Sequence, residues 1–312
     1  MAVLWLSAVL SAIALTVSTS VRGETERTST AVDGTRAYYV ATGGIDRALL
    51  WILWGPKFRN PDGTSLYFQS PMPRLHFEFP AGVADVEVIP ESSKLDINRA
   101  PPEQLLALMA ALGVPGGDMI VQGIVDWRSP TPGGAFTDFD QHYLSISPTF
   151  RARHASFEEI EELLLVRGVT PELFYGSYQP GPDGRLLPRP GLRDCLSIYS
   201  TPGVIDVNSV QPAVMQALGI PPDAAAQIVA MRRRAPFRLP DQLANLPAGS
   251  AGRLGFGTSA VITLRATASA RLPNGRLSDM RRSVSALIAF LGEQYTPSYH
   301  ILRWYDNAVV VQ

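Results

Sequence analysis

The side chains that most often carry enzyme chemistry are few and scattered in this sequence. Its four histidines show no paired metal-ligand spacing: His76, His142, His154 and His300. Neither a Gly-x-Ser-x-Gly motif nor a P-loop motif occurs. The single cysteine, Cys195, cannot form an internal disulfide, and we expect it to be a small buried apolar residue. These observations predict a protein that is not an enzyme.

One short basic cluster offers a different chemistry, the binding of phosphate. Arg232–Arg234 lie within residues 217–243, which resemble the helix-hairpin-helix DNA-binding module. Such a hairpin holds phosphate through backbone N–H groups, but the turn here, Gly219–Pro222, contains two prolines that lack this donor. The formal net charge of −1 also gives no global positive field. We expect the arginines to lie on a solvated face, and a membrane-tethered DNA-binding or DNA-uptake protein is the alternative function.

These basic residues follow the second copy of an internal repeat. Residues 95–112 have the sequence LDINRAPPEQLLALMAAL, and residues 205–218 have IDVNSVQPAVMQAL. Asn98 and Asn208 can turn the chain, and the proline four residues later suits the first turn of a helix. Two homologous helical modules are the economical explanation. Further helices are expected at 120–127 and 157–166 in the first module and at 224–231 and 240–246 in the second.

The longest predicted element is an N-terminal helix. Residues 1–21 carry no charged side chain, and residues 22–54 continue an amphipathic pattern up to Pro56. About 20 helical residues cross the ~30 Å hydrocarbon layer of a bilayer. We expect one membrane pass followed by packing on a soluble domain, as in a pilin-like subunit, with an ordinary anchor or a signal peptide as alternatives. Gly43 and Gly44 are expected to weaken the helix. The face expected to bind partner helices carries Ala37, Val40, Ile45 and Leu49.

Predicted β-strands flank the helical modules. We expect strands at 65–69, 75–79 and 83–88 before the modules, and at 259–270, 280–290 and 300–304 after them. This order favours an α+β fold: a long N-terminal helix on a pilin-like antiparallel sheet, with an all-helical block of two modules inserted between its strands. The expected boundaries are a transmembrane segment at 1–21, the helix continuation and first strands at 22–94, a first module at 95–176, a linker at 177–204, a second module at 205–250 and C-terminal strands at 251–312.

Taken together, several of these segments resemble type II secretion system protein K, a minor pseudopilin. The resemblance rests on VLWLSAVLSAIAL at 3–15, AYYVATGGIDRALLWIL at 38–54, KLDINRAPPEQLLALMAALG at 94–113, IVDWRSP at 124–130, SFEEIEELLLVRGVTPELF at 156–174 and IDVNSVQP at 205–212. It implies a subunit at the tip of the pseudopilus that takes part in protein export across the outer membrane. The implied partners are the minor pseudopilins I and J. The implied location is the inner membrane, with most of the chain in the periplasm and no nucleic-acid partner.

The resemblance also implies particular residues. Most pilin-like subunits have a glutamate at the fifth mature position, which protein K lacks, and here no acidic residue precedes Glu24. The family binds calcium in the loop after the DWR element, where Asp138 and Asp140 are the matching acids. Calcium takes several oxygen ligands, and Phe136 stands where the family usually has a glutamate, so we expect one site of weak to moderate affinity. Asp126 is expected to hold a helix end or to pair with Arg128.

Overall fold

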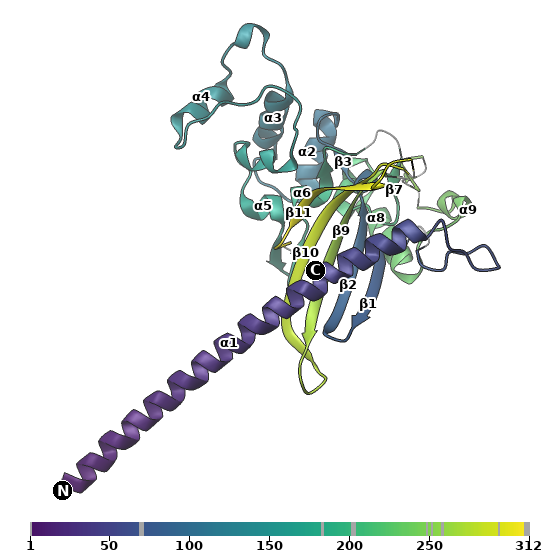
Figure 1. The fold of residues 1–312 in the computed structure, drawn as a ribbon. Coiled ribbons are helices and arrows are strands. Elements are labelled where there is room, and N and C mark those ends of the chain that lie inside the picture. The colour runs from purple at the N-terminus through teal and green to yellow at the C-terminus, as the bar shows by residue number, and fades with distance from the viewer. Residues whose placement is uncertain are drawn as a thin grey trace.

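The computed structural model describes residues 2–68, 72–181, 184–200, 204–247, 249–250, 252–256, 259–292 and 294–308. Within these ranges the protein consists of one long helix, an antiparallel sheet and a block of short helices (Figure 1). This is the α+β arrangement that the sequence pattern predicts.

Helix α1 (Ala2–Trp54) is a single continuous helix. It ends immediately before Gly55 and Pro56, as expected from the missing proline N–H. Its N-terminal part projects away from the rest of the protein (Figure 1). Gly43 and Gly44 do not interrupt it. Gly44 packs directly on the sheet, where a side chain would collide with Ala84.

The main sheet contains five antiparallel strands in the order β1-β2-β9-β10-β11. The strands are β1 (Arg74–Phe79), β2 (Gly82–Pro90), β9 (Val261–Arg271), β10 (Leu277–Phe290) and β11 (Tyr299–Tyr305). Since β2 pairs with β9, everything between them is an insertion between two neighbouring strands, as predicted.

One predicted strand is absent. Of residues 65–69, Gln69 lies outside the described residues, and Ser65 forms only an isolated bridge with Arg59. Here Tyr67 packs against Trp51 and Trp54 at the end of α1. Local aromatic packing therefore replaces strand pairing in this segment.

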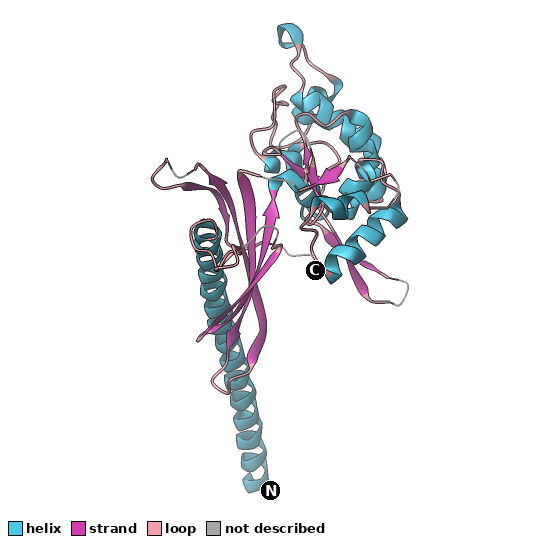
Figure 2. Ribbon diagram, turned by 90° about the vertical axis from the view of Figure 1, so that its right-hand side faces the viewer, coloured by secondary structure: helices cyan, strands magenta, loops and turns pink. Residues whose placement is uncertain are grey.

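Helix α1 covers one face of the sheet, and the helical block lies beyond the opposite side (Figure 2). Burial alternates along β2 and β9, which directs every second side chain toward α1. The centre of this core includes the fully buried Ala84, Val86, Leu264, Ala266 and Val284. The small alanines allow the helix to approach the strands closely.

The inserted block contains the two predicted modules, which share one hydrophobic core. The first module is built from η1 (Glu91–Ser93), β3 (Leu95–Asp96), α2 (Pro102–Ala111), α3 (Gly117–Arg128), η2 (Pro132–Gly134), α4 (Asp138–Ser145), η3 (Ile160–Leu165) and α5 (Pro171–Tyr175). The second is built from β7 (Ile205–Asp206), α7 (Pro212–Ala217), α8 (Pro222–Arg234), α9 (Pro240–Ala244) and β8 (Leu254–Gly255). Helices α2 and α7 pack against each other and join the modules.

The predicted linker at 177–204 is more structured than expected. It contains a hairpin of β4 (Ser177–Pro180) and β5 (Leu186–Arg189), then α6 (Leu192–Cys195) and β6 (Leu196–Ser197). Strand β6 pairs in parallel with β3, so this segment completes the first module. Strand β8 pairs with β7 in the same way in the second module. Cys195 is fully buried, as predicted.

Candidate functional sites

The exposed N-terminal part of α1 is the first candidate site. Its apolar side chains face outward, and Val3 and Trp5 are 79% and 72% exposed. In the part of the chain that the structure describes, α1 is the one helix long and apolar enough to cross a membrane, and none of its most apolar stretch is buried. So large an apolar surface is unfavourable in water. Its length matches the thickness of the hydrocarbon layer of a lipid bilayer.

The four residues assigned to partner helices lie on a different surface. Ala37, Val40, Ile45 and Leu49 are 0%, 5%, 1% and 5% exposed. The last three belong to the core that α1 forms with the protein's own sheet. A Cβ added at Gly44 would lie 2.8 Å from the Cβ of Ala84, so the contact is close. This corrects the assignment made from the sequence, which identified an amphipathic face but not what covers it.

A second apolar stripe on α1 remains exposed. Val32, Tyr39, Leu50 and Trp54 are between 36% and 68% exposed. Their spacings of seven, eleven and four residues place them on one side of a helix with 3.6 residues per turn. The outward side of the helix can therefore contact a neighbouring helix, and the inward side cannot.

Each helical module is closed by the same asparagine contact. The side chain of Asn98 accepts a hydrogen bond from the N–H of Phe157 at 2.7 Å and donates one to its carbonyl at 3.1 Å. Asn208 makes the same two bonds with Phe237, at 2.8 and 3.0 Å. The asparagines therefore do more than turn the chain, and their identical spacing in the repeat was the signal for a shared structural role.

An arginine adds a second set of contacts in each module. We call the asparagine and arginine contacts of one module its clasp: Asn98 and Arg128 in the first module, Asn208 and Arg232 in the second. Arg128 donates to the carbonyls of Ile97 and Ala100. Arg232 donates to the equivalent carbonyls of Val207 and Val210, at 3.0 and 2.8 Å. The prediction of a solvated face is thus wrong for Arg232, although Arg233 and Arg234 are exposed. Burial lowers the pKa of Arg232 to about 10.

A buried charged cluster stabilises the long loop of the first module. Oδ1 of Asp140 accepts a hydrogen bond from the N–H of Ala152 at 3.1 Å. Its Oδ2 accepts from the N–H of Thr137 at 3.2 Å, from Nε2 of His154 at 2.8 Å and from Nε of Arg151 at 3.4 Å. Nδ1 of His154 lies 3.1 Å from the carbonyl of Asp126. Since both ring nitrogens face oxygen acceptors, the doubly protonated imidazolium satisfies both contacts.

These contacts shift the pKa values of the cluster. Burial would raise the pKa of Asp140, but the hydrogen bonds from His154, Thr137 and Ala152 outweigh it and lower the pKa. Burial would lower the pKa of His154, but its contacts with Asp140 and Asp126 raise it. The pKa of Asp126 is raised mainly by burial. Asp126 lies beside His154 and not in a pair with Arg128, which corrects the second of its two expected roles.

The predicted calcium ligands do not form a suitable donor set in this structure. Asp138 is exposed on the first turn of α4, whereas Asp140 is buried with both oxygens already accepting hydrogen bonds. The described ranges contain no group of three or more His, Cys, Asp or Glu residues that could hold a metal ion. Calcium binding at Asp138 and Asp140 stays a prediction, and it requires Asp140 to exchange its present partners for the ion.

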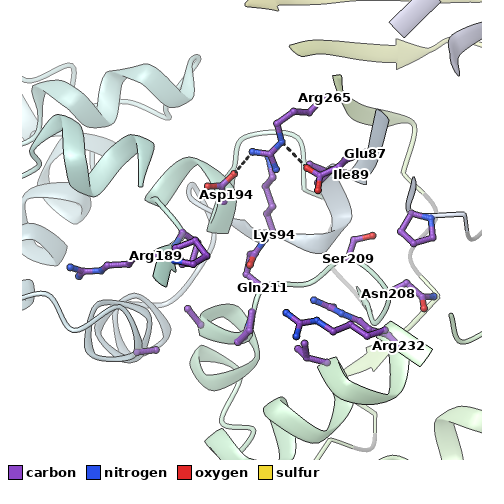
Figure 3. A pocket seen from close by; sticks show the side chains of 18 of the residues that line it. Glu87, Ile89, Lys94, Arg189, Asp194, Asn208, Ser209, Gln211, Arg232 and Arg265 are labelled. Atoms are coloured by element: carbon purple, nitrogen blue, oxygen red, sulfur yellow. Dashed lines mark hydrogen bonds and ion pairs between the residues drawn. The ribbon is translucent and has the colours of Figure 1, made fainter. Parts of the chain in front are cut away.

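A cleft of about 1080 Å³ lies where the sheet, both modules and the β4–β5 hairpin meet (Figure 3). Arg265 of β9 reaches between Glu87 and Asp194, at 3.0 and 3.2 Å, and ties the sheet to the helical block. Lys94 lies beside it and forms a buried ion pair with Glu91 at 2.8 Å. No sequence pattern indicates this cleft, because its walls come from segments far apart in the chain.

The architecture defines a class of protein: an apolar helix that continues along a pilin-like antiparallel sheet, with a helical block inserted into the sheet. Residues 86–176, from within β2 to just after α5, match the family model described as type II secretion system (T2SS), protein K. The resemblance inferred from the sequence is confirmed over these residues.

Solved structures provide a second comparison. One chain from the crystal structure of the GspK-GspI-GspJ complex of the enterotoxigenic Escherichia coli type 2 secretion system is similar, with 16% sequence identity and a TM-score of 0.48. The alignment covers 92% of this chain and 98% of that chain. The comparison with curated proteins found no match.

Proposed function

We propose that the protein is a minor pseudopilin of the type II secretion system that lies at the tip of the pseudopilus and takes part in protein export across the outer membrane. The observation that carries the proposal is the two-part helix α1, whose first half is exposed and apolar and whose second half is buried on the sheet. The match of residues 86–176 to protein K supports it. The proposed role is structural and not enzymatic.

The proposed location is the bacterial inner membrane, with residues from about 22 onward in the periplasm. A periplasm-only reporter fused after residue 60 tests it, because the fusion follows α1, the one candidate span among the described residues. An active reporter is expected. A stable fusion protein with a silent reporter would contradict the proposed orientation.

The proposed partners are the minor pseudopilins I and J, contacted through the exposed stripe of α1. Tyr39 and Leu50 are central to this stripe. Replacing both with glutamate should reduce co-purification of I and J about tenfold, because charges would enter an apolar helix contact. Leu66→Glu is the matched control, since Leu66 is 55% exposed and lies off the helix. Equal losses in both proteins would argue against the stripe as the interface.

The structure weakens the support for the alternative, a membrane-tethered DNA-binding protein. Arg232 is committed to the clasp, and Pro221 and Pro222 remove two backbone donors from the turn. Duplex binding by the full chain near physiological salt, with affinity falling steeply as salt rises, would favour the alternative.

A further inference from the structure

The cleft of Figure 3 is cationic, although the whole chain has a net charge of −1. Two carboxylates occur among the described residues that line it, Glu87 and Asp194. The cationic side chains are more numerous: Arg74, Lys94, Arg189, Arg232, Arg233, Arg238 and Arg265. The lining of the cleft therefore carries an excess of positive charge that the chain as a whole does not have.

Both carboxylates are already neutralised. Glu87 pairs with Arg74 at 3.0 Å and with Arg265 at 3.0 Å, and Asp194 pairs with Arg265 at 3.2 Å. Neither carboxylate is left to attract the remaining arginines or to repel an incoming anion strongly.

Three arginines of the cleft remain without an anionic partner among the described residues. Arg189 ends β5, Arg233 lies in the last turn of α8, and Arg238 precedes α9. Seven cationic and two acidic side chains line the cleft, so its potential is positive and a bound anion would be favoured.

The helical fold itself does not require these charges. The N–H of Arg238 donates to Gln242 in the second module, and the N–H of Glu158 donates to Glu162 in the same way in the first. An acidic residue therefore fills the equivalent position in the other module. The module fold therefore does not require a positive charge at the position of Arg238.

The rest of the lining includes apolar side chains, among them Leu187 from the hairpin and Val229 from α8. At about 1080 Å³ the cleft lies at the upper end of the roughly 300–1,000 Å³ of ligand pockets, so it is large enough for a short peptide segment. A lining that is both cationic and apolar can contact acidic and apolar side chains of one bound segment, and in an extended chain both kinds can be presented along its length.

We infer that this cleft binds an extended acidic segment of another protein, with carboxylates on Arg189, Arg233 and Arg238 and small apolar side chains against Leu187 and Val229. This inference goes beyond the proposed function and does not depend on it. Arginine recognises carboxylates through paired N–H donors, so the arrangement favours aspartate or glutamate side chains.

The test uses the full chain in detergent micelles and a fluorescein-labelled eight-residue peptide in which glutamate alternates with alanine. Fluorescence anisotropy should show saturable binding that weakens with salt, and the matching glutamine peptide should bind at least about tenfold more weakly. Arg233→Gln combined with Arg238→Gln should weaken binding by about tenfold or more. Arg234→Gln is the matched control, because Arg234 is exposed on the same helix turn but does not line the cleft. It should change the affinity less than about twofold.

Three results would overturn the inference. The first is no binding of the glutamate peptide at about 1 mM, a concentration that corresponds to a binding free energy of only about −4 kcal/mol. The second is an equal loss of affinity in Arg234→Gln and in the double variant. The third is tighter binding of duplex DNA than of the peptide through the same arginines. If the double variant does not fold, Arg189→Gln on the hairpin replaces it, with the same expected direction.

Discussion

The two helical modules share the same asparagine and arginine contacts but differ in the segment of chain that joins the arginine to the phenylalanine. Asn98 and Asn208 hold Phe157 and Phe237 with nearly identical hydrogen bonds. Arg128 and Arg232 donate to matching carbonyls. These contacts satisfy buried backbone groups that short strands and helices leave open, so both copies need them.

The chain between the arginine and the phenylalanine differs greatly. In the first module residues 129–156 form a long loop with α4, held by Asp140 and His154. In the second, only residues 233–236 make this connection, and Ala230 occupies the position of Asp126. The first module thus contains a buried charged cluster, and the second has exposed arginines. The shared clasp holds the same backbone arrangement in both modules, whereas the segment between the arginine and the phenylalanine differs in length and in charge.

Breaking the clasp should give the largest effect. Asn98→Ala and Asn208→Ala each leave the N–H and carbonyl of a phenylalanine without their partner. Each should lower the free energy of unfolding by about 2–4 kcal/mol, measured by urea denaturation of the full chain. Asn245→Ala is the control, since Asn245 is exposed and makes only a local bond to the carbonyl of Asp241. If only one of the two asparagines matters, the modules are not equivalent in stability.

The sequence predicted the scaffold better than the contacts that close it. Periodicity identified α1 and the five strands of the main sheet, and it also predicted a strand at 65–69 that is absent. The internal repeat identified both modules. The partners of Asn98 and Asn208 lie 59 and 29 residues away, so no local pattern could reveal them. The apolar periodicity of α1 predicted one amphipathic face. Whether the protein's own sheet or another helix covers Ala37 and Ile45 on that face depends on tertiary packing. The cleft was missed for the same reason.

The charged cluster of the first module should make stability depend on pH. The pKa of His154 is raised in the folded state, so its contribution is complete below its unfolded value of about 6.5 and is lost as pH rises through the folded value. The pKa of Asp140 is lowered, so its contribution is present above about pH 4 and is lost as pH falls through the folded value. The pair should stabilise the fold most between about pH 4 and 6.5.

His154→Asn tests this dependence, because asparagine tolerates the positive φ of 51° at this position. The difference in melting temperature between wild type and variant should be about 2–4 °C larger at pH 5.5 than at pH 8.5. His142→Asn on α4 is the control and should give no such difference. A wild-type advantage that is equal at both pH values would mean that His154 contributes packing and not charge.

Calcium should have the smallest effect, because the ion must compete for Asp140 with groups that already neutralise it. His154 and Arg151 both contact Oδ2 of Asp140. Millimolar calcium should therefore raise the melting temperature of the wild type by less than about 2 °C. It should raise that of His154→Asn by more, since this variant removes one competing cation. Asp138→Ala should abolish the rise in both backgrounds if Asp138 and Asp140 form the site. A rise that survives Asp138→Ala would place the ion elsewhere, and no rise in His154→Asn would mean that Asp140 serves only to hold the inserted loop.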